Sequence, residues 1–215
     1  MARACVAEVA VIGSVERLWP GSTIVCIGGG PSLNQADVDR CKGAHVIAVN
    51  DAYRMAPWAD VLYACDARWW NWHAKALSGF EGLRFGLHVP NATVLNGCQV
   101  TMLRNAGPRG LSNSPDAVCH GSNSGYQAVN VAVHLGASRI VLLGYDMQPS
   151  KDGRVHWFGQ HAIPQATSRP PFEAFKAAFE SLRKPLKDLG IEVINATRET
   201  ALTTFPRVTI DEALA

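Results

Sequence analysis

The chain has 215 residues, of which 47% are apolar and 18% are charged, and its formal net charge is +2. A chain of this length and composition can bury the core of one large domain or two small ones, which excludes a disordered protein. The nearly balanced charge neither favours nor opposes a polyanionic partner.

Residues 1–21 are predicted to form an N-terminal extension, a helix or strand that packs on the domain and ends at Pro20-Gly21. The apolar run at residues 4–13 contains Glu8 and is too short for a membrane span. It also lacks the basic lead and cleavage site of a signal peptide. The six cysteines include no C-x-x-C pair, which favours reduced thiols and a cytoplasmic location.

The rest of the chain alternates between short apolar runs and helical segments. This pattern predicts a single α/β domain, residues 1–215, with a Rossmann-like, mostly parallel sheet flanked by helices. Expected strands are 23–27, 45–49, 60–65, 85–88, 93–95, 139–143 and 191–195. Expected helices are 35–41, 67–77, 125–135 and 172–189, and Gly136 is expected to end the third in a left-handed cap. Residues 96–120, rich in Gly, Pro, Asn and Ser, are expected to form a loop.

The segment GGGPSL, residues 28–33, directly follows the first predicted strand. Glycines at such a turn let backbone N–H groups approach an anion, and the next helix points its positive end at it. Ser32 and Gln35 have capping-box spacing, which predicts a helix start at Ser32. The segment matches neither common phosphate loop, because Leu33 replaces the third glycine of G-x-G-x-x-G and no Gly-Lys-Ser/Thr follows. A tight turn without a ligand is the alternative interpretation.

Four predicted strands are followed by glycine or by polar residues suited to a ligand. These are Gly28, Asn50-Asp51, Asp66 and Gly144-Tyr145-Asp146. Since ligands of open parallel sheets bind beyond the carboxyl ends of the strands, we expect these residues to converge on one crevice. Asn and Asp also cap helices, so each residue alone is ambiguous, and it is the set together that favours a ligand.

A second candidate anion site lies at residues 121–127 (GSNSGYQ), directly before the third predicted helix. Small residues there would leave the N-terminus of the helix open toward the same crevice. Ser124 and Gln127 again have capping-box spacing, and a serine N-cap without a ligand is the alternative.

Two histidines, His156 and His161, lie on the loop that follows Asp146. Imidazole groups there could act as acid or base, or donate to a phosphate. Zinc ligation is the weaker interpretation, because the spacing is unusual and no cysteine lies nearby. We expect His156, His161 and Asp146 to be catalytic. The aromatic run at residues 69–72 could stack a sugar or base, but a core-facing stripe is the more frequent explanation.

Five segments carry a family resemblance: VCIGGGPSL, AVNDAY, ADVLYACDARWW, SNSGYQAVNVAVHLGASRIVLLGYDM and IEVINATRETALTTFP. In this order they resemble the superfamily of the bacterial lipooligosaccharide α-2,3/2,8-sialyltransferases. That superfamily also holds relatives of the 6-hydroxymethylpterin diphosphokinase and phage-encoded proteins of unknown role. The resemblance covers most of residues 22–206. It implies a transferase that binds a nucleotide or nucleotide-sugar donor, with glycosyl transfer as the expected activity.

The resemblance also implies site residues. Positions that contact the cytidine nucleotide in the sialyltransferases match Gly29, Asn50, Asp66 and Ser124, which implies a CMP-type donor. Gly29 and Asp66 stand where asparagines are usual, so the base and sugar stay open. Together with the motifs, the expected nucleotide-binding set is Gly28, Gly29, Gly30, Pro31, Ser32, Asn50, Asp51, Asp66, Ser122, Asn123, Ser124, Gly125 and Tyr145.

The chain departs from the sialyltransferases in its catalytic groups. Tyr145 and His156 match their phosphate-binding tyrosines only approximately. Their general-base histidine before the last long helix has no counterpart at residues 167–171, so His156 or His161 would have to supply the base.

Two other functions stay open. One is a magnesium-dependent diphosphokinase or phosphotransferase, for which Mg²⁺ with a triphosphate would require carboxylates at Asp66 and Asp146. The other is a catalytically inactive nucleotide-binding module, favoured by the missing histidine. The expected acceptor is a glycan, or a nucleic acid if the protein is phage-encoded, and a homo-oligomer is left open.

Overall fold

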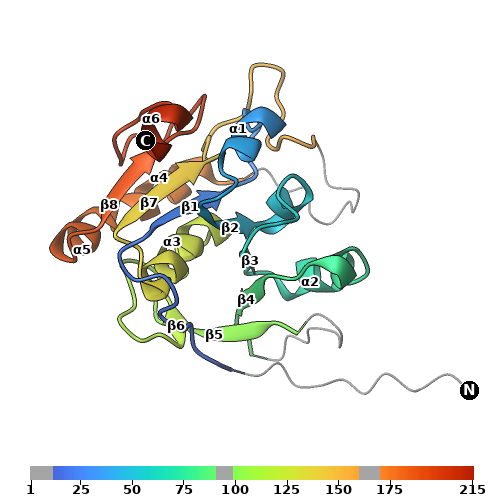
Figure 1. Cartoon of the computed structure of the whole chain (residues 1–215), viewed down its shortest axis with the longest axis vertical. Helices are drawn as coiled ribbons and strands as arrows, with labels where there is room; N and C mark the ends of the chain where they lie inside the picture. The colour runs from blue at the N-terminus through green and yellow to red at the C-terminus, as the bar shows by residue number, and fades with distance from the viewer. Residues whose placement is uncertain (1–11, 91–98, 160–169) are drawn as a thin grey trace, which may run out of the picture.

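A computed structural model of the chain describes residues 12–90, 99–159 and 170–215. Its centre is one eight-stranded, all-parallel sheet in the order β6-β5-β4-β3-β2-β1-β7-β8, with helices on both faces (Figure 1). The strands are β1 (Thr23–Ile27), β2 (His45–Val49), β3 (Val61–Ala64), β4 (Leu83–Leu87), β5 (Thr101–Asn105), β6 (Ala117–Val118), β7 (Arg139–Leu143) and β8 (Glu192–Asn195). The predicted Rossmann-like α/β fold is confirmed.

The helices form two layers because successive strand residues face opposite sides of the sheet. On one face, Ile24 and Cys26 of β1 share a core with α3 (Ser124–Leu135), α4 (Phe172–Glu180) and α5 (Arg183–Asp188). On the other, Val25 and Ile27 share a second core with α1 (Gln35–Arg40), α2 (Ala67–His73) and α6 (Ile210–Leu214). Two short 3₁₀ turns, η1 (Asn50–Arg54) and η2 (Ala76–Gly79), complete the described elements.

One expectation about residues 96–120 is wrong, and one about a strand at residues 93–95 is not covered by the described residues. Residues 96–120 are not a loop throughout, because they contain β5 and β6, which extend the parallel sheet beyond β4. Burial of Met102 and Leu103 outweighs the turn-rich composition around them. The strand expected at residues 93–95 lies outside the described residues.

The expected long helix at residues 172–189 is two helices, α4 and α5, with a break at Ser181 and Leu182. Pro185 explains the break. It has no N–H to donate to the carbonyl of Ser181, four residues earlier, and its ring crowds that carbonyl. The helix expected at residues 67–77 ends at His73, and a 3₁₀ turn follows it.

Both predicted capping boxes are wrong. The N-cap of α1 is Asn34, whose side chain accepts the Asp37 N–H at 3.0 Å. The N-cap of α3 is Asn123, and the Gln127 side chain is buried instead, where its Oε1 accepts the Tyr63 hydroxyl at 2.6 Å. The cap at the other end of α3 is confirmed, since Gly136 has φ 106°.

Residues 12–21 pack along the domain without forming a helix. Val15 is buried, its N–H bonds the Pro115 carbonyl at 2.8 Å, and the Trp19 ring stacks on His45 at 4.2 Å. The cysteines with described positions, Cys26, Cys41, Cys65 and Cys119, are free thiols. Over the described ranges, we find no helix with the length and apolarity to cross a bilayer.

Candidate functional site

A cleft of about 410 Å³ opens at the carboxyl ends of β1, β2, β3 and β7. It lies where the strand order reverses: from β1 the chain builds the sheet outward to β6, then returns to place β7 on the other side of β1 (Figure 1). Ligands of open α/β sheets bind at this switch point. The volume lies within the roughly 300–1,000 Å³ range of small-molecule sites.

Most of the site residues predicted from the sequence line this one cleft. They are Gly28, Gly29, Gly30, Pro31, Asn50, Asp51, Asp66, Ser122, Asn123, Ser124, Gly125, Tyr145, Asp146 and His156. Gly29 and Ser124, 95 residues apart in the chain, therefore share a single hollow. Ser32 is the exception: it is not among the lining residues. His161 lies outside the described residues.

The glycine loop leaves one of its N–H groups for a ligand. The N–H of Gly28 donates to the Leu143 carbonyl at 2.7 Å, and that of Gly30 donates to the Gly144 carbonyl at 2.8 Å. These two bonds join the loop to the end of β7. Between them, the N–H of Gly29 has no acceptor in the part of the chain that the structure describes.

The N-terminus of α3 supplies two more N–H groups, those of Ser124 and Gly125. The first turn of a helix has no intrahelical acceptors for its N–H groups, and here Asn123 caps only that of Tyr126, at 3.0 Å. Within the described ranges, no acceptor faces those of Ser124 and Gly125. Since α3 also points its positive end into the cleft, this rim favours an anion.

The side chains of Ser124 and Tyr145 are committed elsewhere. The Ser124 hydroxyl donates to the Cys65 sulfur at 3.1 Å and accepts the Cys65 N–H at 3.2 Å. The Tyr145 side chain is buried, and its hydroxyl donates to the Gly125 carbonyl at 3.2 Å. Tyr145 therefore does not offer a hydroxyl to a phosphate in this structure, contrary to the role implied by the resemblance.

Asp146 turns its carboxylate under the glycine loop. Its Oδ2 accepts the Ser32 N–H at 2.9 Å, whereas its Oδ1 is buried with no partner in the described chain. A Cβ at Gly30 would lie only 1.9 Å from this Oδ1, so a glycine is required there. Burial raises the pKa of Asp146 to about 6, against the opposing effect of the Ser32 hydrogen bonds. Because Oδ1 is sealed from solvent, a direct catalytic role for Asp146 does not fit this arrangement.

The two other acidic residues of the cleft have structural partners. Asp51 is buried, and its Oδ2 accepts the indole N–H of Trp69 at 2.9 Å. Asp66 caps α2 through the Arg68 N–H at 2.9 Å and pairs with the Arg68 guanidinium at 2.7 Å. Burial raises the pKa of Asp66, but the hydrogen bonds from Arg68 lower it further, to below its usual value. Asp66 is thus ionised and partly neutralised at pH 7.

Several residues that line the cleft have a strained backbone conformation. Three of its lining residues have positive φ without being glycine: Asn50 at 51°, Ser122 at 54° and Met147 at 51°. Such conformations cost about 1–3 kcal/mol each and concentrate at ligand sites. Asn50 lies directly after the end of β2 and lines the cleft.

His156 stands beside the glycine loop. Its ring stacks on Phe158 at 5.0 Å, and its Nδ1 lies 3.7 Å from the place where a Cβ of Gly29 would be. The loop is tied to the glycine turn by the Trp157 N–H, which donates to the Gly29 carbonyl at 3.2 Å. An imidazole there can exchange a proton with a group bound at the N–H of Gly29.

Sequence reasoning missed the apolar wall of the cleft. This wall includes Trp72, Met147, Phe158, Phe172 and Phe175. The aromatic run at residues 69–72 signalled it in part: Trp70 is fully buried, whereas Trp69 and Trp72 line the cleft. The other residues come from separate segments, and no periodicity links them.

In the described part of the chain, no group of three or more His, Cys, Asp or Glu side chains is arranged to hold a metal ion. Asp66 is bound to Arg68, and the Asp146 carboxylate lies beneath the glycine loop. These carboxylates do not form the magnesium pair that a triphosphate-dependent phosphotransferase would require here.

Searches with protein-family models, among curated proteins and among solved structures find no match to this chain. The resemblance to the sialyltransferase-like superfamily therefore rests on the sequence motifs alone.

We predict that Gly30→Ala destabilises the fold by about 2 kcal/mol, because the new methyl group would displace the Asp146 carboxylate and also meet the Gly144 carbonyl at 2.7 Å. Gly29→Ala is the matched control: its nearest neighbour is a His156 ring atom at 3.7 Å, an ordinary contact. Urea unfolding of both variants measures the difference. Equal stability of the two variants would contradict the close approach of Asp146 to Gly30.

We also predict that Asp146→Asn gains stability over the native protein as pH rises. An acid whose folded pKa is about 6 and whose unfolded pKa is roughly 4 binds more protons when folded, so native stability falls between those pH values. Asp146→Asn has no carboxyl to titrate, so its free energy of unfolding does not fall in this way. The difference in the free energy of unfolding, variant minus native, should rise by about 2 kcal/mol from pH 4 to pH 7.5. Urea unfolding across this pH range checks it, and a constant difference would show that the carboxyl is not perturbed.

Proposed function

We propose that the protein binds a nucleotide or nucleotide-sugar in this cleft and transfers a group from it to an acceptor. Glycosyl transfer of the sialyltransferase-like type is the favoured reaction. The proposal is carried by the three N–H groups of Gly29, Ser124 and Gly125, which two distant segments bring to one cleft. Uncharged N–H groups at a helix N-terminus are a common means of binding phosphate.

The remainder of the cleft suits the rest of such a donor. Asn50 offers an amide to ribose or base, and it lines the same cleft as Asp66, whose two carboxylate oxygens both accept hydrogen bonds from Arg68. The aromatic faces of Trp72 and Phe158 line the same space and could stack a flat base. A phosphate held at the helix N-terminus would leave the transferred group near His156.

His156 is the candidate acid or base. It would deprotonate the acceptor hydroxyl or protonate the leaving phosphate, the two proton transfers that glycosyl transfer from a nucleotide needs. The resemblance would put the general base just before α4, but residues 167–171 of the sequence contain no histidine. The alternatives are a magnesium-dependent phosphotransferase and an inactive nucleotide-binding module, and binding measurements separate them.

The first test is thermal unfolding with CMP, CDP, UDP, GDP and ATP, with and without magnesium. A ligand that binds only the folded state raises the midpoint, and at one hundred times its Kd adds about 2.7 kcal/mol. We expect a mononucleotide or diphosphate to stabilise the protein without metal. A response restricted to magnesium with ATP would favour the phosphotransferase, and no response to any nucleotide would contradict the proposal.

The second test is His156→Ala, which should reduce donor hydrolysis or transfer at least a hundredfold while changing nucleotide affinity less than threefold. His45→Ala is the control, because His45 stacks on Trp19, is not a lining residue of the cleft, and should keep full activity. Unchanged turnover in His156→Ala would remove it from the mechanism.

A further inference from the structure

The glycine loop rests on Asp146, a buried acid for which the described residues supply no ion-pair partner. Of the two carboxylate oxygens of Asp146, one accepts the Ser32 N–H and the other is sealed beneath Gly30 without a partner. The residue is 2% exposed, so bulk solvent does not reach Oδ1. An isolated ionised carboxylate in such a place is costly, and the neutral form is correspondingly favoured.

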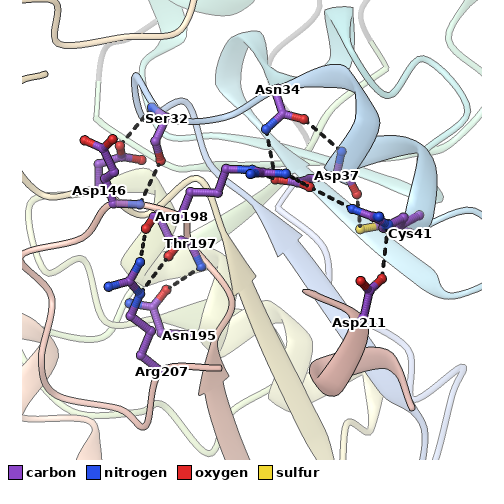
Figure 2. Close-up of polar contacts among 12 residues, drawn as sticks. Ser32, Asn34, Asp37, Cys41, Asp146, Asn195, Thr197, Arg198, Arg207 and Asp211 are labelled. Carbon is purple, nitrogen blue, oxygen red and sulfur yellow. Dashed lines mark hydrogen bonds and ion pairs between the residues drawn. The ribbon is translucent and has the colours of Figure 1, made fainter. Parts of the chain in front are cut away.

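The segment after β8 holds this acid in place. The Ala201 N–H donates to the Asp146 carbonyl at 2.7 Å, and the Glu199 N–H donates to the Ser32 hydroxyl at 3.3 Å. Figure 2 shows Ser32 between Asp146 and this segment, with the dashed contacts that join them. These contacts hold the Asp146 backbone and the Ser32 side chain, and turning the carboxyl group away from the loop would break its hydrogen bond from the Ser32 N–H.

The charged groups around Asp146 do not neutralise it. Glu199 is a second acid, whose charge adds to the effect of burial on the pKa of Asp146. Arg198, drawn in Figure 2, turns its guanidinium to Asp37, which accepts its Nη2 at 2.8 Å. His156 lines the same cleft, and imidazole is the side-chain group whose ordinary pKa lies closest to neutral pH.

We propose that Asp146 is a positioning residue whose protonation is coupled to anion binding at the glycine loop: the neutral carboxyl supports the loop when the anion is bound, and binding takes up a proton from solvent. This rests on the proposed anion site. The physical reason is that an ionised carboxylate beneath Gly30 and an anion at the N–H of Gly29 would repel across one residue of backbone in a poorly solvated place.

The coupling has a definite sign. With a pKa of about 6, Asp146 is neutral in about 3% of molecules at pH 7.5 and in about 75% at pH 5.5, and the apparent affinity follows the competent fraction. The native protein should therefore bind an anion about 25-fold more tightly at pH 5.5 than at pH 7.5.

Inorganic sulfate is the probe, because it stays fully ionised over this pH range. We would follow its binding through the ¹H–¹⁵N signal of Gly29 in the native protein and in Asp146→Asn, which has the same shape without the charge. Asp146→Asn should bind sulfate about thirtyfold more tightly than the native protein at pH 7.5 and about equally at pH 5.5. Other groups that change charge over this pH range are present in both proteins, so their effect on binding cancels in the comparison.

The Ser32 N–H signal gives a second readout that needs no ligand. In the native protein its shift should follow the Asp146 carboxyl with a midpoint near pH 6, and in Asp146→Asn this inflection should disappear. A flat Ser32 signal, or weaker sulfate binding by Asp146→Asn at pH 7.5, would overturn the inference while leaving the anion site intact. If sulfate bound neither protein, the proposed function would fail, and this inference with it.

Discussion

The hydrogen-bonded contact between the ends of β1 and β7 is the interaction on which the rest of the site depends. Two N–H groups of the glycine turn, those of Gly28 and Gly30, donate hydrogen bonds to carbonyls at the end of β7. This fixes the turn across the switch point of the sheet and leaves Gly29, which lines the cleft, with an N–H that has no acceptor in the described chain. It also brings Asp146 so close to Gly30 that a side chain could not be accommodated there. The same contact therefore determines both the donor that is available and the acid that supports it.

Three features of the cleft distinguish it from a simple turn between a strand and a helix. The N–H groups of Gly29, Ser124 and Gly125 have no acceptors in the described chain, Asp146 lacks a partner at Oδ1, and three non-glycine residues have positive φ. Buried polar groups are usually satisfied, and departures from that rule collect where a ligand completes the structure. Together they favour a ligand-binding interpretation over a tight turn with caps.

The sequence was sufficient for the parallel sheet and for most of the residues around the cleft, because both follow from local patterns. Apolar runs that end in Gly, Asn or Asp predict strands whose carboxyl ends meet. What could not be predicted is which hydrogen-bonding groups already have a partner within the protein. Ser32 and Gln127 have capping-box spacing, yet Asn34 and Asn123 cap the helices. That choice depends on contacts between distant segments, such as the Tyr63 hydroxyl that takes up the Gln127 side chain. The short strands β5 and β6 were likewise hidden by a turn-rich composition and form because β4 offers them an edge.

The most direct test of the central claim is a ¹H–¹⁵N titration with pyrophosphate, which probes the phosphate site without assuming a base or sugar. The account predicts that the largest shifts occur at the N–H groups of Gly29, Ser124 and Gly125, and that they saturate together with one Kd. A second cleft, of about 560 Å³, is lined by Arg40, Arg198 and Arg207 and is the alternative place for an anion. Shifts confined to that cleft, with Gly29 and Gly125 unmoved, would contradict the account.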